Sequence, residues 1–221
     1  FFRDLAAYFY PIKFSVAESF KAGHLPLWEP HMATGFPILA EFQSAVFYPP
    51  SVIFYLVPFF AAIQFSYVFH YAVAASGSYV LLRSWTQPIY LCVIGSILFS
   101  FGGTMVSLTN LLNHFQSAVW LPWLVYCWER AVENKRWSTL VVFSMVAVCQ
   151  LLAGSPEVFA FSAVLLVADI VRMYSKEKSG AVSSNVARLS AAGLMVMGIA
   201  MVQLLPTAEL ILQSRRDQAI P

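Results

Sequence analysis

The sequence predicts an all-α fold: a polytopic α-helical membrane protein with about six transmembrane helices and an external loop that carries amphipathic surface helices. Hydrophobic residues make up 59% of the 221 residues and charged residues only 11%, whereas soluble domains carry about 25% charged residues. Apolar runs of bilayer-spanning length recur along the chain, and cations concentrate in the short segments between them. The net charge of +2 argues against nucleic acid as a partner.

The chain is expected to consist of three parts. Residues 1–58 form a first external loop, 59–210 form the helix bundle, and 211–221 begin a further external segment. The chain opens on "FFRD" without an initiator Met, and its first two residues resemble the tail of an apolar segment. We therefore expect a fragment of a longer protein.

Six runs are long and apolar enough to be candidate spans, since a helix needs about 20 apolar residues to cross a bilayer. They cover residues 59–82, 88–109, about 111–128, 137–154, 157–172 and 189–206. The hydrophobic run 46–58 is only 13 residues long and contains three prolines. At that length an interfacial or re-entrant helix is expected rather than a span.

The distribution of positive charge predicts the orientation. The segments 129–137 and 172–189 carry most of the loop cations and are assigned to the cytoplasm. Residues 1–58 and the connections near 110–114 and 153–157 then lie outside. Arg215 and Arg216 follow the last span on the outer side, against the positive-inside rule.

The segment 4–22 is predicted to be an amphipathic surface helix. Ile12, Val16 and Phe20 recur every four residues, while the charged Lys13, Glu18 and Lys21 fall elsewhere on the helical wheel. This helix is expected to begin near Pro11 and to be capped by Gly23. Residues 24–37 hold three prolines and Gly35 and form an irregular loop, and 38–50 holds a second short surface helix.

This layout places a set of polar side chains on the outer side of the membrane. Asp4 is the candidate catalytic residue, because a carboxylate at a membrane edge can act as a general base toward a hydroxyl. The alternative is a helix N-cap. Candidate substrate-binding residues are His24, Glu29, His31, Glu41, Asn113, His114, Glu157, Glu209 and Arg215.

Several of these residues also have purely structural interpretations. Asn113 and His114 fit a hydrated turn between two helices, and Glu157 follows Ser155 in a helix-start pattern. Glu209 either lines an external cavity or takes part in contacts between helices. His70 is interpreted as a core histidine, and Asp169 and Arg172 as a local ion pair. The spacing of the histidines does not indicate zinc.

Four passages resemble a known bacterial membrane family. "GHLPLWEPHMATGFP" (23–37) is the most specific, followed by "NLLNHFQSAVWLPWLVYCWERA" (110–131), "LLAGSPEVF" (151–159) and "QLLPTAELILQSRR" (203–216). They resemble the YfhO family, which is similar to polytopic glycosyltransferases of the GT-C fold. The resemblance extends over nearly the whole chain, and it implies a GT-C-like architecture in the bacterial cytoplasmic membrane with an extracytoplasmic active face.

The resemblance also implies a reaction and its partners. Enzymes of this class transfer a sugar from a polyprenyl-phosphate-linked donor, and here the acceptor would be a cell-envelope polymer such as a teichoic acid. They carry an acidic residue in the first external loop, the position that Asp4 matches. Many carry two neighbouring acids there, whereas this sequence has Arg3 before Asp4. No cofactor is therefore assigned, and a divalent cation remains an alternative.

Two other functions fit the same sequence. A transporter or flippase of lipid-linked sugars would need the same groove for its lipid and favours broken helices. A non-catalytic envelope assembly protein would tolerate alanine at the outer carboxylates. The donor sugar, the acceptor and the number of helices in the full-length protein are not given by the sequence.

Overall fold

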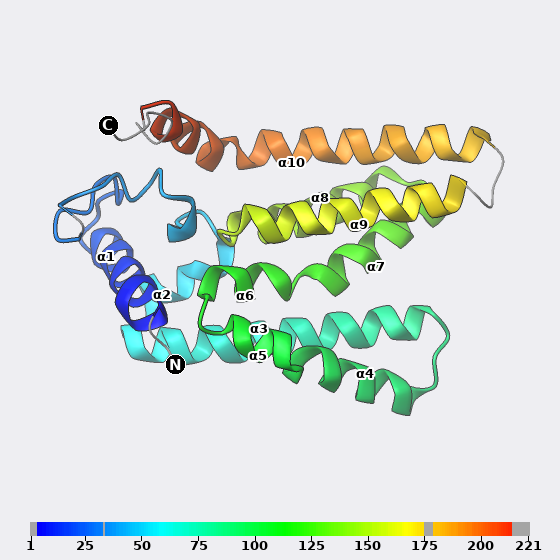
Figure 1. The fold of residues 1–221 in the computed structure, drawn as a ribbon, viewed down its shortest axis with the longest axis horizontal. Coiled ribbons are helices and arrows are strands. Elements are labelled where there is room, and N and C mark those ends of the chain that lie inside the picture. Colours follow the sequence, from blue (N-terminus) through cyan, green and yellow to red (C-terminus); the bar gives the residue numbers. More distant parts are fainter. Residues whose placement is uncertain (1–3, 33, 175–178, 214–221) are drawn as a thin grey trace, which may run out of the picture.

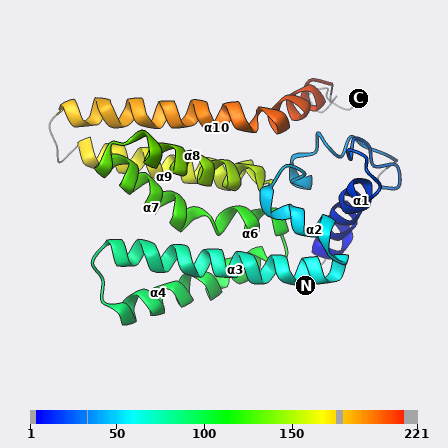
Figure 2. The same cartoon turned by 180° about the vertical axis from the view of Figure 1, so that it is seen from behind.

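The computed structural model describes residues 4–32, 34–174 and 179–213, and the described part is built from helices. Its elements are η1 (Leu5–Phe9), α1 (Tyr10–Lys21), η2 (Phe42–Ser44), η3 (Pro49–Val52), α2 (Ile53–Leu56), α3 (Phe59–Ser84), α4 (Ile89–Phe101), α5 (Gly103–Leu108), α6 (Leu112–Ala118), α7 (Leu121–Asn134), α8 (Trp137–Leu152), α9 (Pro156–Tyr174) and α10 (Ser179–Gln213). The long helices lie roughly side by side, and the N-terminal segment covers one end of the bundle (Figures 1 and 2).

The protein is an α-helical membrane protein by the length and composition of its helices. Within the described residues, three stretches are long and apolar enough to cross a membrane: Phe59–Ser84, Ile89–Leu108 and Ser183–Gln213. The helix Trp137–Leu152 is apolar but shorter. The chain therefore has the predicted class, while the count of about six spans stays a prediction.

The run 111–128 differs most from its predicted form, because it does not make one continuous helix. Helix α6 ends at Ala118, and α7 begins at Leu121 with Pro122 in its first turn. Proline fits the first turn of a helix, where its missing N–H costs nothing. Helix α7 then continues to Asn134, beyond the predicted boundary. A second break separates α4 from α5 at Gly102, whose backbone is extended.

The N-terminal helix begins earlier than the sequence suggests. The π-helical turn η1 leads directly into α1, so Pro11 lies inside a continuous helical segment rather than at its start. Helix α1 ends as predicted: Gly23 has a φ of 78° and its N–H donates to the Phe20 carbonyl, a glycine cap. Within the run 46–58, residues 49–56 form the short helices η3 and α2, which are shorter than the length needed to cross a bilayer.

Polar groups and loop cations lie at opposite ends of the bundle. The α3–α4 and α7–α8 connections, the end of α9 and the start of α10 lie at one end, on the right of Figure 1. These connections include or flank Arg83, Lys135 and Arg136. The N-terminal segment, the start of α6 and the α8–α9 turn lie at the other end. This arrangement agrees with the predicted sorting of charges, and the side of the membrane that each end faces stays a prediction.

A buried hydrogen-bonded network joins residues 46–52 to the bundle. The Trp120 indole N–H donates to the Tyr48 hydroxyl at 2.8 Å, and that hydroxyl lies 2.7 Å from His70 Nε2. The other imidazole nitrogen, Nδ1, lies 2.6 Å from the Ser66 carbonyl oxygen. An indole N–H only donates and a carbonyl only accepts. The neutral His70 ring therefore carries its proton on Nδ1 and accepts from Tyr48, which confirms a core histidine with both nitrogens satisfied.

Helices α3 and α7 meet at Gly77. A Cβ atom built on Gly77 would lie 2.6 Å from Cδ1 of Trp123. The indole ring of Trp123 is itself held by a 3.0 Å hydrogen bond from Nε1 to the Val73 carbonyl. The small residues around Gly77 therefore let two helices approach closely.

Replacing Gly77 by alanine is expected to lower the free energy of unfolding by about 1–3 kcal/mol, the usual cost of overpacking. The added methyl group forces the Trp123 ring out of its hydrogen bond. Thermal unfolding of the purified chain in detergent measures the loss. Gly103→Ala is the matched control, since no heavy atom among the described residues lies within 4 Å of that added Cβ. An unchanged Gly77→Ala transition would contradict the close approach.

Candidate functional site

Asp4 lies at the polar end of the bundle and is not used as a helix cap. It precedes η1 with helical backbone angles, and its side chain makes no capping hydrogen bond. The carboxylate is instead approached by the Asn110 side-chain amide, with Nδ2 at 3.5 Å from Oδ2. Asn110 lies in the turn between α5 and α6, 106 residues away in the sequence. The carboxylate is exposed and available to a ligand.

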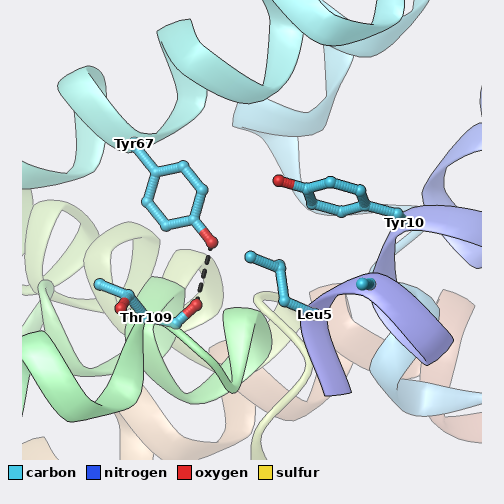
Figure 3. Close-up of a pocket in the computed structure, with 5 residues that line it drawn as sticks. Leu5, Tyr10, Tyr67 and Thr109 are labelled. Carbon is cyan, nitrogen blue, oxygen red and sulfur yellow. Dashed lines mark hydrogen bonds between the residues drawn. The ribbon is translucent and has the colours of Figure 1, made fainter. Parts of the chain in front are cut away.

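A cavity of about 420 Å³ lies beside this pair, between η1, α3 and the end of α5. Its lining consists of Leu5, Ala6, Tyr10, Tyr67 and Thr109. The Tyr67 hydroxyl donates to the Thr109 carbonyl at 2.9 Å, and Figure 3 shows this bond with the Tyr10 hydroxyl directed toward the same space. Asp4 and Asn110 are not among the lining residues but are the chain neighbours of two of them, Leu5 and Thr109.

The cavity combines an apolar lining with a polar rim. Most of its exposed lining surface is carbon, with phenol hydroxyls and backbone oxygens supplying the polar atoms. Small-molecule sites in proteins typically have this composition: an apolar enclosure with a few placed polar groups. A ligand with an apolar part in the cavity and hydroxyl groups at its mouth would reach the Asp4 carboxylate.

Asn113 and His114 lie near this site and mainly connect helices. The Asn113 amide is buried and donates to the Gly154 carbonyl at 2.8 Å, which joins α6 to the α8–α9 turn. The half-buried His114 ring lies 2.9 Å from the Asn113 amide oxygen through Nδ1. This contact orients the imidazole at the polar end of the bundle. Its Nε2 makes no hydrogen bond to the described residues.

The carboxylates of the predicted set have different surroundings. The Glu41 carboxylate accepts a hydrogen bond from the Gln43 N–H at 3.4 Å. The pKa of the Tyr8 phenol is raised mainly by burial, and to a smaller extent by the negative charge and the hydrogen bond of Glu41. The Tyr8–Glu41 pair thus connects the N-terminal helical segment to the loop before η2.

The Glu157 carboxylate lies at the start of α9. It accepts a hydrogen bond from the Ser155 hydroxyl at 3.2 Å, and the same hydroxyl accepts one from the Val158 N–H.

Glu29 is buried and holds the 24–37 loop in place. Its carboxylate accepts hydrogen bonds from the Ser15 hydroxyl on α1 and from the His31 N–H. Its backbone pairs with Phe36 in an antiparallel bridge. His24 and His31 are exposed on the same loop. Through Glu29 the loop is therefore tied to α1.

Of the two remaining predicted residues, the structure describes only Glu209, near the end of α10. Glu209 is exposed and accepts from the Gln213 amide, one turn further along the helix. Arg215 lies outside the described residues. Gln203 and Thr207 connect α10 to the loop instead: the Gln203 amide donates to the Leu39 carbonyl at 2.9 Å and the Thr207 hydroxyl to the Ala40 carbonyl at 2.8 Å.

Sequence reasoning missed the residues that line the cavity and one buried cation. Tyr10, Tyr67 and Thr109 belong to ordinary apolar helices, and no motif marks them. Lys13 was placed off the apolar face of its helix, but it is only 3% exposed. Its ammonium donates to the Ser44 carbonyl at 2.8 Å and lies 5.9 Å from the centre of the Phe54 ring. Burial lowers the pKa of Lys13 to about 7.

The fold and the site together define an α-helical membrane protein with a cavity and a free carboxylate at one end of its bundle. Comparison with family models, with curated proteins and with solved structures finds no match to this chain. In the described part of the chain, no three His, Cys, Asp or Glu side chains lie close enough to hold a metal ion.

Proposed function

We propose that this chain is part of a membrane glycosyltransferase-like protein of the YfhO type that uses a polyprenyl-phosphate-linked sugar on the outer face of the bacterial cytoplasmic membrane. The proposal is supported by one observation above all. The Asp4 carboxylate is exposed and caps no helix. It adjoins in sequence the lining of a 420 Å³ cavity, at the end of the bundle where the apolar helices stop. The resemblance of residues 23–37 to that family supplies the reaction type.

In the proposed reaction, the Asp4 carboxylate removes the proton from an acceptor hydroxyl as that oxygen attacks C1 of the sugar. The bond between C1 and the phosphate oxygen breaks, the lipid phosphate leaves with the bonding electrons, and the configuration at C1 inverts. Asn110 orients the carboxylate. The Tyr10 and Tyr67 rings form a surface for the sugar, and His114 lies on the same end to contact hydroxyl or phosphate oxygens. A cell-envelope polymer supplies the acceptor hydroxyl.

Asp4→Asn is expected to abolish sugar transfer and to leave expression and membrane insertion intact, because the amide cannot accept the proton. The measurement is release of polyprenyl phosphate from a labelled lipid-linked sugar, in membrane vesicles that contain the longer protein. Glu18→Gln is the matched control, since Glu18 is an exposed carboxylate that pairs only locally with Lys21. Full activity in Asp4→Asn would remove the catalytic role.

The external location of the site has a separate and simpler test. A topology reporter fused after Gly35 is expected to give an extracytoplasmic signal, because residues 24–37 lie at the Asp4 end of the bundle. A cytoplasmic signal would contradict the orientation and with it the reaction on the outer face.

A flippase or transporter of lipid-linked sugars is the second candidate, favoured by the interrupted helices. The breaks at Gly102 and between α6 and α7, together with Pro206 inside α10, resemble the discontinuous helices of transporters. Vesicles that move a fluorescent lipid-linked sugar across the bilayer equally well with wild type and Asp4→Asn would favour this function over transfer.

A further inference from the structure

A second, wholly apolar cleft lies far from the Asp4 site, between the middle portions of α8, α9 and α10. Its volume is about 290 Å³. The lining includes Phe143 and Ala147 of α8, Ala163 and Leu166 of α9, and Gly193 and Met197 of α10. The lining residues of α10 extend from Leu189 to Met197, which corresponds to a length of about 12 Å along the helix.

The cleft opens onto an exposed apolar surface of α9 and α10. Val167 and Met197 line it and are 52% and 47% exposed, and their neighbours Val164 and Leu194 are exposed apolar side chains. An unfilled apolar space of this size deprives its lining atoms of contacts. In a bilayer, hydrocarbon chains are the groups available to fill it.

Positive charge collects at one end of this cleft. Arg188 precedes the lining residue Leu189, and its guanidinium donates to the backbone carbonyls of Ala131, Lys135 and Arg136. Its Nε is buried and has no hydrogen-bond partner in the described part of the chain. In the same described residues, neither Lys135 nor Arg136 forms an ion pair with a carboxylate. Lys135, Arg136 and Arg188 thus meet at the α7–α8 connection, and none of them pairs with a carboxylate of the described residues.

Along the helices, the cations come first and the apolar cleft follows, in the same order as the headgroup and the acyl chain of a phospholipid. Arg136 precedes α8, and Phe143 is seven residues further on, a separation of about 10 Å along the helix. A phospholipid carries its phosphate at one end and its hydrocarbon chain directly below. Basic pockets between transmembrane helices are known to bind anionic lipid headgroups.

We propose that this cleft binds an acyl chain of an anionic phospholipid, whose headgroup phosphate is held by Lys135, Arg136 and Arg188. The cleft is formed by other helices than the Asp4 cavity, and its cations lie at the opposite end of the bundle, so the site is independent of the proposed transfer reaction. The bound lipid fills the space beside α9 and neutralises the charge where the α7–α8 connection meets α10.

The test uses the chain reconstituted in vesicles of phosphatidylcholine and phosphatidylglycerol, with one lipid at a time carrying a photoreactive diazirine in its acyl chain. Crosslinked peptides are then identified by mass spectrometry. With labelled phosphatidylglycerol, crosslinks are expected on the α8, α9 and α10 residues that line the cleft.

Two glycines of α10 provide matched variants. No heavy atom of the described chain lies within 4 Å of a Cβ added at Gly193 or at Gly198, and only Gly193 lines the cleft. Gly193→Phe is expected to fill the cleft and remove these crosslinks, whereas Gly198→Phe retains them. Equal crosslinking in both variants would overturn the assignment of the chain to the cleft. If Gly193→Phe does not fold, Ala163→Leu fills the same space from α9 and decides the question.

Charge variants test the headgroup separately. Lys135→Gln and Arg136→Gln leave the contacts of Arg188 intact, because Arg188 binds their backbone carbonyls. Each is expected to lower crosslinking by labelled phosphatidylglycerol about fivefold, and to leave the weaker crosslinking by labelled phosphatidylcholine unchanged. Equal crosslinking by the two lipids in the wild-type chain would overturn the anionic headgroup site.

Discussion

Replacing His70 by alanine is expected to lower the free energy of unfolding by about 4 kcal/mol, since it combines a cavity with broken buried hydrogen bonds. His70 is 1% exposed. Its ring joins Tyr48 of the N-terminal part to the Ser66 carbonyl on α3. Without the imidazole, the hydroxyl proton of Tyr48 loses its buried acceptor. The measurement is equilibrium unfolding in mixed micelles, followed by tryptophan fluorescence.

Tyr48→Phe separates the hydrogen bonds from the cavity. It keeps the ring in place and removes the hydroxyl, so the Trp120 N–H and His70 Nε2 both lose a partner. The expected cost is about 1–3 kcal/mol. The double variant is expected to cost less than the sum of the two, because the residues share one network. Strict additivity would contradict a coupled network.

Replacing Lys13 by methionine is expected to stabilise the protein at neutral and acidic pH and to remove a pH dependence. The ammonium is buried and donates a hydrogen bond to the Ser44 carbonyl. Burial lowers the pKa of Lys13 from 10.5 to about 7. The folded chain therefore binds fewer protons than the unfolded chain between these two values. Stability rises with pH through that window and is constant below pH 7 and above pH 10.5 with respect to this group.

The size of the effect follows from the shift. The cost of burying the charge below pH 7 is on the order of 5 kcal/mol, at 1.36 kcal/mol per pKa unit. Lys13→Met removes this cost but leaves the Ser44 carbonyl unpaired, which costs about 1–3 kcal/mol. The net gain near pH 6 is therefore about 2–4 kcal/mol, and above pH 10.5 the variant becomes the less stable protein. Denaturation curves at pH 6, 8.5 and 11 measure this crossing, with Lys21→Met as an exposed control. If the stability of the wild type and of Lys13→Met changed with pH in the same way, the charge of a buried Lys13 would not destabilise the fold.

Local sequence features were enough to predict the class of fold and many of its local details. The apolar runs could only become helices, because a helix satisfies every backbone group within its own segment. Gly23 caps α1 as expected. Ser155 caps α9, and the Asp169–Arg172 pair forms at 2.6 Å. Each of these depends on residues within about one helical turn, where the chain itself fixes the separation.

The location of the candidate residues near one end of the bundle was predictable, but their individual surroundings were not. The placement of loop cations was enough to expect Asp4, Asn113, His114 and Glu157 near one end of the bundle. It did not distinguish Glu29, which is buried in contacts with Ser15 and His31, from the exposed Asp4. Burial of a polar group depends on which segment covers it, and that is decided by the packing of the 24–37 loop on α1.

The sequence by itself determined that this chain forms apolar helices, where α3, α8 and α9 begin and end to within two residues, and which end of the bundle carries the cations. Only the tertiary structure decided that Asn110 approaches Asp4, that Tyr10 and Tyr67 share a cavity, and that α6 and α7 are separate helices. It also decided that Lys13 is buried. The physical reason is the separation along the sequence of the residues that interact. Helix formation and capping depend on neighbours within a turn, whereas these contacts depend on how helices far apart in the sequence pack together.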